Sequence, residues 1–249
     1  MGTVAVDFST PISTVIPSLD GPVLQVLARS DRMLSGRQVH AEAGTGSVAG
    51  VRLVLQRLAS TGLVHVDEAG TSLLYRLNRS HLAAQAVELL ANLRATFADT
   101  LAANINSWRI PPLHASLYGA AARGEGNLTS DVALLLIRSD EVATDNLLWE
   151  QQVGGLMSDI VELTGNPVDV DELSLRDLAN HHHAAVPVIQ DWLDRPAILY
   201  GPPLQVLLAG RASVERPILA DLPTLPDLAN FPAFPTLTAG RALTANATA

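Results

Sequence analysis

The segment from residue 47 to residue 78, SVAGVRLVLQRLASTGLVHVDEAGTSLLYRLN, does most to limit what this chain can fold into. Its first part repeats apolar residues at intervals of three and four, which predicts a helix with one buried face. The repeating residues are Val48, Val51, Leu55 and Leu58. Gly62 is placed to end this helix. Two β-prone runs then flank Glu68-Ala69-Gly70, and this pattern predicts a β-hairpin.

Two shorter helical patterns precede this segment. The stretch PVLQVLARS places Val23, Leu24 and Leu27 on one side of a short helix. In SGRQVHAEAG, Ser35 is placed to cap a second helix and Gly44 to stop it. The order from residue 21 to residue 80 is therefore helix, helix, turn, helix and hairpin.

This order resembles the winged helix-turn-helix of bacterial transcriptional regulators. The stretch GVRLVLQRLASTGLVHV is similar to the end of a recognition helix that enters its wing. In such regulators the third helix lies in the major groove of DNA, with its early residues toward the base edges. The resemblance implies contacts to double-stranded DNA from Arg37, Thr45, Ser47, Arg52, Gln56 and Arg57.

Arg52 is the strongest single candidate among these residues, because a guanidinium group can contact O6 and N7 of guanine together. Arg57 or Arg37 would hold phosphate. The expected wing tip, residues 68–71, contains no arginine to contact phosphate. The alternative is a winged helix that serves protein contact or dimerisation.

The distribution of charge supports the DNA-binding interpretation. The whole chain has a net charge of −9, which argues against indiscriminate coating of nucleic acid. Between Gly21 and Ser80, however, seven arginines outnumber four acidic residues, so this segment carries +3. The segment is therefore a candidate module for facing phosphate.

The pattern from Ser80 onward predicts one long helix over residues 81–108. Its apolar stripe recurs at three and four residues and comprises Ala86, Leu90, Leu93, Phe97, Leu101, Ile105 and Trp108. A stripe of this length packs either on a partner helix or on the neighbouring domain of the same chain. We expect a homodimer, because two half-sites on one duplex multiply affinity.

Residues 114–137, HASLYGAAARGEGNLTSDVALLLI, predict a strand, a turn and a second strand. The stretch resembles the nucleotidyltransferase superfamily that includes the minimal nucleotidyltransferases and DNA polymerase β. The family pattern is a strand, Gly-Ser, a short helix with Ala-Arg-Gly, and Asp-x-Asp on the next strand. Matching residues are Gly119, Ala122, Arg123, Gly124, Ser130 and Asp131. The resemblance covers residues 111–178 and implies a nucleotide-binding turn at Gly119, Ala120, Arg123 and Gly124.

Two departures from this pattern bear on catalysis. Nucleotidyl transfer uses Mg²⁺ held by carboxylates at positions i and i+2 of a strand, which share one face. Asp131 is present, but position i+2 is Ala133, and Ala120 replaces the hydroxyl of the Gly-Ser turn. Asp169 or Asp171 on a later strand could supply further metal ligands. Catalysis is therefore not expected, whereas Mg²⁺ and nucleotide binding without turnover, and a scaffold role, stay open.

The chain divides by pattern into five regions. They are an N-terminal arm (1–20), a winged helix-turn-helix (21–80), a linker or dimerisation helix (81–108), a nucleotidyltransferase-like domain (109–200) and a Pro-rich tail (201–249). The predicted fold class is α+β. The histidine triplet 181–183 spreads around a helix and is expected to be a solvated helix end, not a metal site.

The absence of cysteine excludes disulfides and thiolate metal sites. No apolar run is long enough for a membrane helix, and the first residues lack the pattern of a signal peptide. We therefore expect a cytoplasmic protein without a membrane partner. The predicted function is a DNA-binding transcriptional regulator that requires no cofactor and whose second domain senses a nucleotide or small effector, dimerises or positions the first. The alternatives are a Mg²⁺-dependent nucleotidyltransferase recruited by its winged helix and a toxin–antitoxin component.

Overall fold

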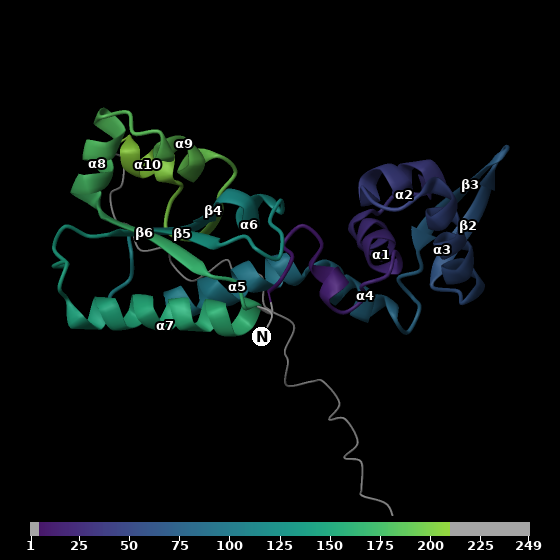
Figure 1. Cartoon of the computed structure of the whole chain (residues 1–249), viewed down its shortest axis with the longest axis horizontal. Coiled ribbons are helices and arrows are strands. Elements are labelled where there is room, and N and C mark those ends of the chain that lie inside the picture. The colour runs from purple at the N-terminus through teal and green to yellow at the C-terminus, as the bar shows by residue number, and fades with distance from the viewer. Residues whose placement is uncertain (1–4, 210–249) are drawn as a thin grey trace, which may run out of the picture. The chain divides into compact units, whose positions relative to one another are not determined.

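The computed structural model describes residues 5–209 and shows a mixed α+β chain with two small sheets (Figure 1). The first sheet belongs to a module of three helices and three strands, which we call the first module. Its elements are α1 (Asp20–Arg29), β1 (Leu34–Ser35), α2 (Gly36–Ala43), α3 (Val48–Ser60), β2 (Val64–Ala69) and β3 (Ser72–Leu77). The strands are antiparallel in the order β1-β3-β2.

Local capping sets the bounds of α2 and α3. The Ser35 hydroxyl accepts a hydrogen bond from the Gln38 backbone N–H, and the Gln38 side chain accepts one from the Ser35 N–H. Gly44 ends α2 in the left-handed region with φ of +64°, so the predicted cap and stop are both confirmed. Ser47 then caps α3 by accepting from the Gly50 N–H.

The buried face of α3 packs on α1 and on the hairpin. Val51, Leu55 and Leu58 are buried as the sequence predicts, but Val48 is half exposed. Val48 is the first residue of α3. The hairpin closes through a two-residue turn at Gly70 and Thr71, because Ala69 pairs with Ser72.

The single helix predicted over residues 81–108 is wrong. The chain forms α4 (Ala84–Ala91) and α5 (Leu93–Asn106), which are separated at Asn92. The buried residues of α4 are Ala84, Val87 and Ala91, which pack against the first module, whereas Ala86 of the predicted stripe is exposed. Leu101 and Ile105 of α5 are buried in a different core, so that half of the stripe packs within its own chain.

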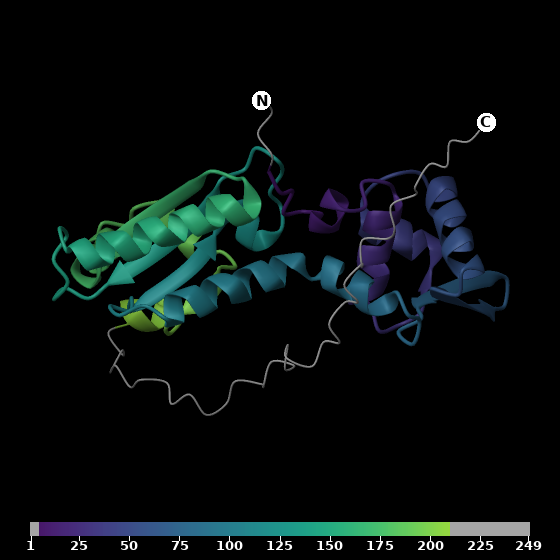
Figure 2. The same cartoon turned by 90° about the horizontal axis from the view of Figure 1, so that it is seen from below.

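The second sheet lies in what we call the α/β module. Its strands are β4 (His114–Tyr118), β5 (Val132–Arg138), β6 (Val168–Ser174) and β7 (Ala197–Tyr200), in the order β6-β5-β4-β7. Only β5 and β6 are parallel; β4 is antiparallel to both of its neighbours. The helices are α6 (Gly119–Arg123), α7 (Leu147–Thr164), α8 (Leu175–His183), α9 (Val188–Leu193) and α10 (Leu204–Leu208). Helices α5 and α7 cover one face, and α8, α9 and α10 cover the other (Figures 1 and 2).

Both ends of the described chain differ from the predicted regions. The arm at residues 1–20 is not separate, because Phe8 is buried against Phe97 and the Val6 N–H donates to the Thr164 carbonyl. A short 3₁₀ helix, η1 (Pro11–Thr14), follows, and Ile12 is buried in the core of the first module. The predicted tail starts too early, since α10 buries Leu204 and Leu207 in the α/β module. Residues 210–249 of that tail lie outside the described residues.

No helix between residues 5 and 209 is both long and apolar enough to cross a bilayer.

Candidate functional site

The first candidate surface is the outward face of α3. Arg52, Leu53 and Gln56 are exposed, and Leu53 as a whole residue is 67% exposed. Thr45 is also exposed in the turn before α3, whereas the Ser47 hydroxyl is engaged in capping. The structure thus brings Arg52 and Gln56 to one helix face and gives Ser47 a structural role.

Ion pairs separate the arginines of the first module into two groups. Arg57 pairs with Asp20, and Arg79 pairs with both Asp31 and Glu88. Arg32 pairs with Glu42 at 3.4 Å. Within the described part of the chain, by contrast, Arg29, Arg37, Arg52 and Arg76 are exposed and have no carboxylate partner. Arg29 instead donates a hydrogen bond to the Ala91 carbonyl.

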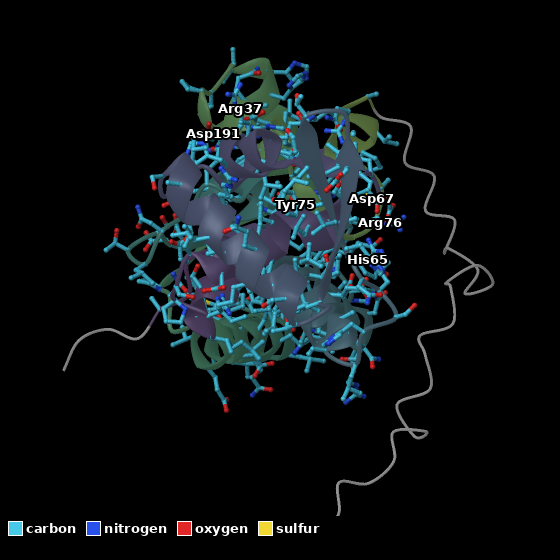
Figure 3. The ribbon with its side chains drawn as sticks, turned by 90° about the vertical axis from the view of Figure 1, so that its right-hand side faces the viewer. Arg37, His65, Asp67, Tyr75, Arg76 and Asp191 are labelled. Carbon is cyan, nitrogen blue, oxygen red and sulfur yellow. The ribbon has the colours of Figure 1, made fainter. Side chains whose placement is uncertain are left out.

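The other three, Arg37, Arg52 and Arg76, come from three different elements: α2, α3 and β3. Figure 3 shows Arg76 beside His65 and Asp67 on the hairpin, at the right of the view. Arg37 lies apart from them, near the top. Arg76 lies opposite His65 in the strand register. Arg76 was not among the residues predicted to contact DNA. Its alternation with buried Tyr75 and Leu77 is the signal that places it outward.

The second candidate surface is the turn between β4 and β5 in the α/β module. Gly119 has φ of +67°, a conformation that glycine adopts without strain. A Cβ atom built on Gly119 would lie 3.8 Å from the Ala133 Cβ. Tyr118 pairs with Ala133, which pairs in turn with Asp169 on β6. The structure therefore brings together the predicted turn, Ala133 and Asp169.

The guanidinium of Arg123 is occupied by carboxylates. Its Nε lies 2.8 Å from Glu125 Oε2, and its Nη1 lies 3.3 Å from Asp194 Oδ2. Arg195 completes the group with Nη2 3.1 Å from Glu125 Oε1. The hydrogen bond that Arg123 donates to Glu125 raises the pKa of Arg123, and the hydrogen bonds that Glu125 accepts from Arg123 and Arg195 lower the pKa of Glu125. Asp194 and Arg195 are distant in sequence and were not predicted at this site.

Asp171 is also engaged within the protein. Its Oδ2 accepts hydrogen bonds from Tyr118 Oη and Trp192 Nε1, both at 2.8 Å. Burial, followed by the hydrogen bond with Asp171, raises the pKa of Tyr118. Tyr118 and Trp192 are both buried, so Asp171 supplies the acceptor that these two donors need.

The residues predicted to bind Mg²⁺ do not fit a metal centre. Over residues 5–209, no three His, Cys, Asp or Glu side chains form a group that could hold a metal ion. Asp131 is exposed just before β5, Ala133 presents a methyl group, and Asp171 is bound by Tyr118 and Trp192. No step through Mg²⁺ can be derived from this arrangement.

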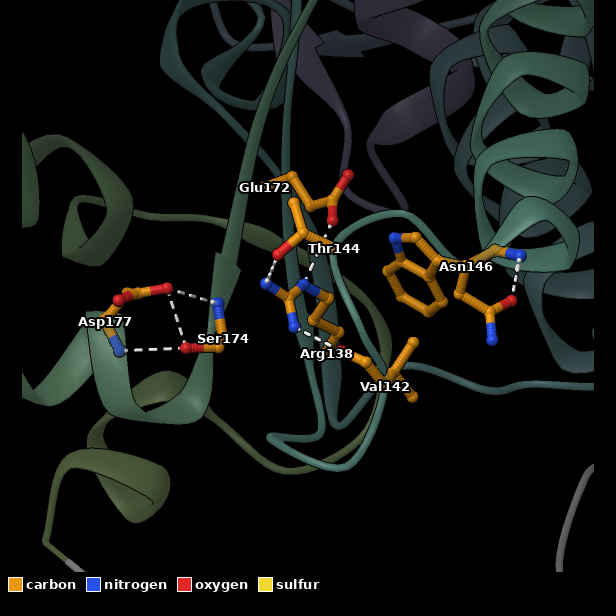
Figure 4. Close-up of polar contacts among 8 residues, drawn as sticks. Arg138, Val142, Thr144, Asn146, Glu172, Ser174 and Asp177 are labelled. Carbon is orange, nitrogen blue, oxygen red and sulfur yellow. Dashed lines mark hydrogen bonds and ion pairs between the residues drawn. The ribbon is translucent and has the colours of Figure 1, made fainter.

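Residues at the carboxyl ends of the parallel strands β5 and β6 make polar contacts with each other and with the segments that follow them (Figure 4). The buried Arg138 has Nε 3.2 Å from Glu172 Oε1, and it also donates to Thr144 Oγ1 and to the Val142 carbonyl. Ser174 and Asp177 form a capping box at the start of α8, and these hydrogen bonds lower the pKa of Asp177. The histidine triplet ends α8, where His182 and His183 are exposed.

His114 is a buried histidine in a fully satisfied pair. Its Nδ1 lies 2.8 Å from the Pro202 carbonyl, which can only accept, so Nδ1 carries the proton. Its Nε2 then accepts from the Ser116 hydroxyl at 2.9 Å. Burial lowers the pKa of His114, against the opposing effect of the Pro202 hydrogen bond.

We expect this histidine to make stability depend on pH in mild acid. Below the ordinary histidine pKa of 6.5, the unfolded chain takes up a proton that folded His114 resists. The free energy of unfolding should therefore fall as the pH drops below 6.5, and level off only beneath the lowered pKa. Urea denaturation at a series of pH values should show a smaller fall for His114→Asn. Equal pH slopes for the two proteins would contradict this assignment, since the other histidines are common to both.

Comparison with known proteins adds no family. No protein-family model and no curated protein matches the chain. Among solved structures, human N-acetylserotonin methyltransferase in complex with SAM is similar over 39% of this chain, with 18% identity and a TM-score of 0.25. The match covers 30% of that protein. A similarity this low supports no conclusion about fold or activity.

Proposed function

We propose that this chain is a DNA-binding transcriptional regulator whose first module is a winged helix-turn-helix. The observation that carries the proposal is the outward face of α3, where Arg52 and Gln56 are exposed and Arg52 has no carboxylate partner among the described residues. The order α1-β1-α2-α3-β2-β3, with a three-stranded antiparallel sheet, supports it. Such an arrangement presents α3 to the major groove and the β2–β3 hairpin as the wing.

The free arginines give each part of this module a role in the proposal. Arg52 reads a base edge with Gln56 beside it, while Arg37 on α2 and Arg76 on the hairpin contact phosphate. Arg57 and Ser47 support the fold, through the Asp20 ion pair and the α3 cap. We propose that the regulator binds DNA as a homodimer in the cytoplasm.

We propose that the α/β module is a nucleotidyltransferase-like domain that does not catalyse transfer. The β4-turn-β5 arrangement and the left-handed Gly119 support the likeness in layout. Ala133 lacks a metal-binding group, Arg123 is held by Glu125 and Asp194, and Asp171 is held by Tyr118 and Trp192. This module would then bind a nucleotide or small effector, mediate dimerisation, or position the first module.

The regulator proposal is tested by selecting genomic DNA fragments that the purified full chain retains. Footprinting of the selected fragments should show a protected site. In a salt titration, the logarithm of the association constant should fall linearly with the logarithm of the salt concentration. Absence of a protected site on every selected fragment, and on the DNA that flanks the gene, would refute the proposal.

A labelling experiment tests the lack of catalysis. Incubation of the wild-type chain with labelled nucleoside triphosphates and Mg²⁺ should give no transfer, because no three-carboxylate group is available among the described residues. The variant with Ala133→Asp and Ala120→Ser restores one ligand and one hydroxyl and serves as the matched comparison. Strong labelling by the wild type that Asp131→Ala abolishes would establish the alternative, a working nucleotidyltransferase.

A further inference from the structure

Leu53 points farther from the core than any other large side chain of α3. The buried residues of this helix are Val51, Leu55 and Leu58. Successive residues of an α-helix turn by about 100° around its axis, which places Leu53 about 165° from the middle of the buried face. By the same geometry Arg52 lies about 95° and Gln56 about 135° from it. Leu53 is therefore close to the centre of the outward face.

The fold does not use Leu53. The residue is 67% exposed, and it belongs neither to the buried core of the first module nor to the partly buried residues packed against that core. Ala49, one turn earlier in α3, is exposed as well. A single exposed leucine is common on protein surfaces. What distinguishes Leu53 is its place at the centre of a helix face whose flanking side chains are polar and positively charged.

The charge around Leu53 is complementary to a polyanion. Arg52 is the preceding residue and has no carboxylate partner among the described residues. Residues 21–80 carry +3 although the whole chain is negative. The major groove of DNA offers phosphates at its edges and base edges on its floor, and the apolar group on that floor is the 5-methyl group of thymine. One such surface matches both the charge and the apolar centre of this face.

We infer that Leu53 determines sequence specificity by packing on the 5-methyl group of a thymine. This inference rests on the proposed DNA-binding function. The side chain that points farthest from the core reaches deepest into the groove, so Leu53 contacts a base edge and not a phosphate. Neighbouring Cα atoms are about 3.8 Å apart and base pairs about 3.4 Å apart, so the thymine lies within about two base pairs of the guanine that Arg52 contacts.

Replacement of thymine by deoxyuridine tests this contact on a selected DNA site. Deoxyuridine lacks the 5-methyl group and keeps every hydrogen-bonding group of the base. Each thymine of the footprint is replaced in turn, and the affinity of the full chain is measured by fluorescence anisotropy. One replacement should weaken binding about three- to fivefold, as expected for one methyl group removed from an apolar contact. It should lie within about two base pairs of the position at which Arg52→Ala relaxes specificity.

Two leucine variants link the effect to Leu53. Leu53→Ala should bring the ratio of the two affinities, thymine against deoxyuridine, to about one, as in a double-mutant cycle. Its urea midpoint should match wild type, because Leu53 lies outside the core. Leu147→Ala is the matched control, since Leu147 is the first residue of α7 in the α/β module and is 73% exposed. This variant should keep the wild-type ratio.

The possible results separate this inference from the function on which it rests. If a protected DNA site contains no thymine that is sensitive to deoxyuridine near the Arg52 position, or if Leu53→Ala keeps the wild-type ratio, the thymine contact is refuted and DNA binding stands. Self-association that Leu53→Ala abolishes, with no effect of deoxyuridine, would assign the residue to protein contact and also refute it. If the full chain retains no DNA fragment, the proposed function fails, and the inference fails with it.

Discussion

Asp171→Ala is expected to lower the free energy of unfolding by about 3 kcal/mol, because two buried donors each lose an acceptor worth about 1 to 3 kcal/mol. Tyr118 Oη and Trp192 Nε1 both donate to Asp171 Oδ2 at 2.8 Å, and both side chains are buried. Urea denaturation at neutral pH measures the loss. The substitution should also bring the raised pKa of Tyr118 closer to its usual value, which ultraviolet titration of the phenol can follow.

Asp169→Ala is the matched control for this variant. Asp169 lies two residues earlier on β6 and is exposed, and it makes no hydrogen bond or ion pair with the described residues. Its loss should change stability by less than about 0.5 kcal/mol. Equal losses for the two variants, or stabilisation of wild type by Mg²⁺ that requires Asp171, would favour the metal-ligand role that the sequence predicts.

Arg52→Ala should weaken binding to a selected DNA site by about 1 to 3 kcal/mol, which corresponds to roughly 5- to 150-fold in the dissociation constant. The loss follows if the guanidinium contacts a guanine edge from the exposed face of α3. Anisotropy measurements with the natural site and with single base-pair changes check the assignment. Specificity should relax at one position, because the variant no longer distinguishes the base that Arg52 contacts.

Two other arginine variants are compared with Arg52→Ala. Arg176→Ala removes an exposed arginine of the α/β module that forms no ion pair among the described residues, and its DNA affinity should match wild type. Arg37→Ala should weaken all DNA sequences alike and reduce the salt dependence, as expected for a phosphate contact. If Arg52→Ala binds the selected site as tightly as wild type, Arg52 on α3 does not contact a base.

Local signals in the sequence predicted the first module well. Ser35 and Gly44 set the bounds of α2 because a capping hydroxyl and a left-handed glycine act within a few residues. The break at Asn92 was missed because an apolar stripe continues across it. Only the packing of Val87 and Ala91 against the first module, and of Leu101 and Ile105 in another core, reveals two helices with different partners.

In the candidate site of the α/β module, only contacts between residues close together in the sequence were predictable. Gly119 follows β4 directly and lies close to Ala133, because Tyr118 at the end of β4 pairs with Ala133 on β5. The partners that occupy Asp171 and Arg123 were not predictable, because Trp192 and Asp194 reach the site from α9 and the residue after it. Pairing between distant residues depends on the folded path of the chain and leaves no mark in the local sequence pattern.

The contacts of Val6 and Phe8 make the α/β module discontinuous in sequence. The chain contributes these first residues to it, then forms the whole first module, and returns through α5 to complete it as far as α10. During synthesis the first module can therefore fold before β7 and α10, the last strand and helix of the α/β module, have been synthesised. A fragment cut at residue 109 would lack Val6, Phe8 and α5, so dissection of this protein should keep its beginning attached to its second half.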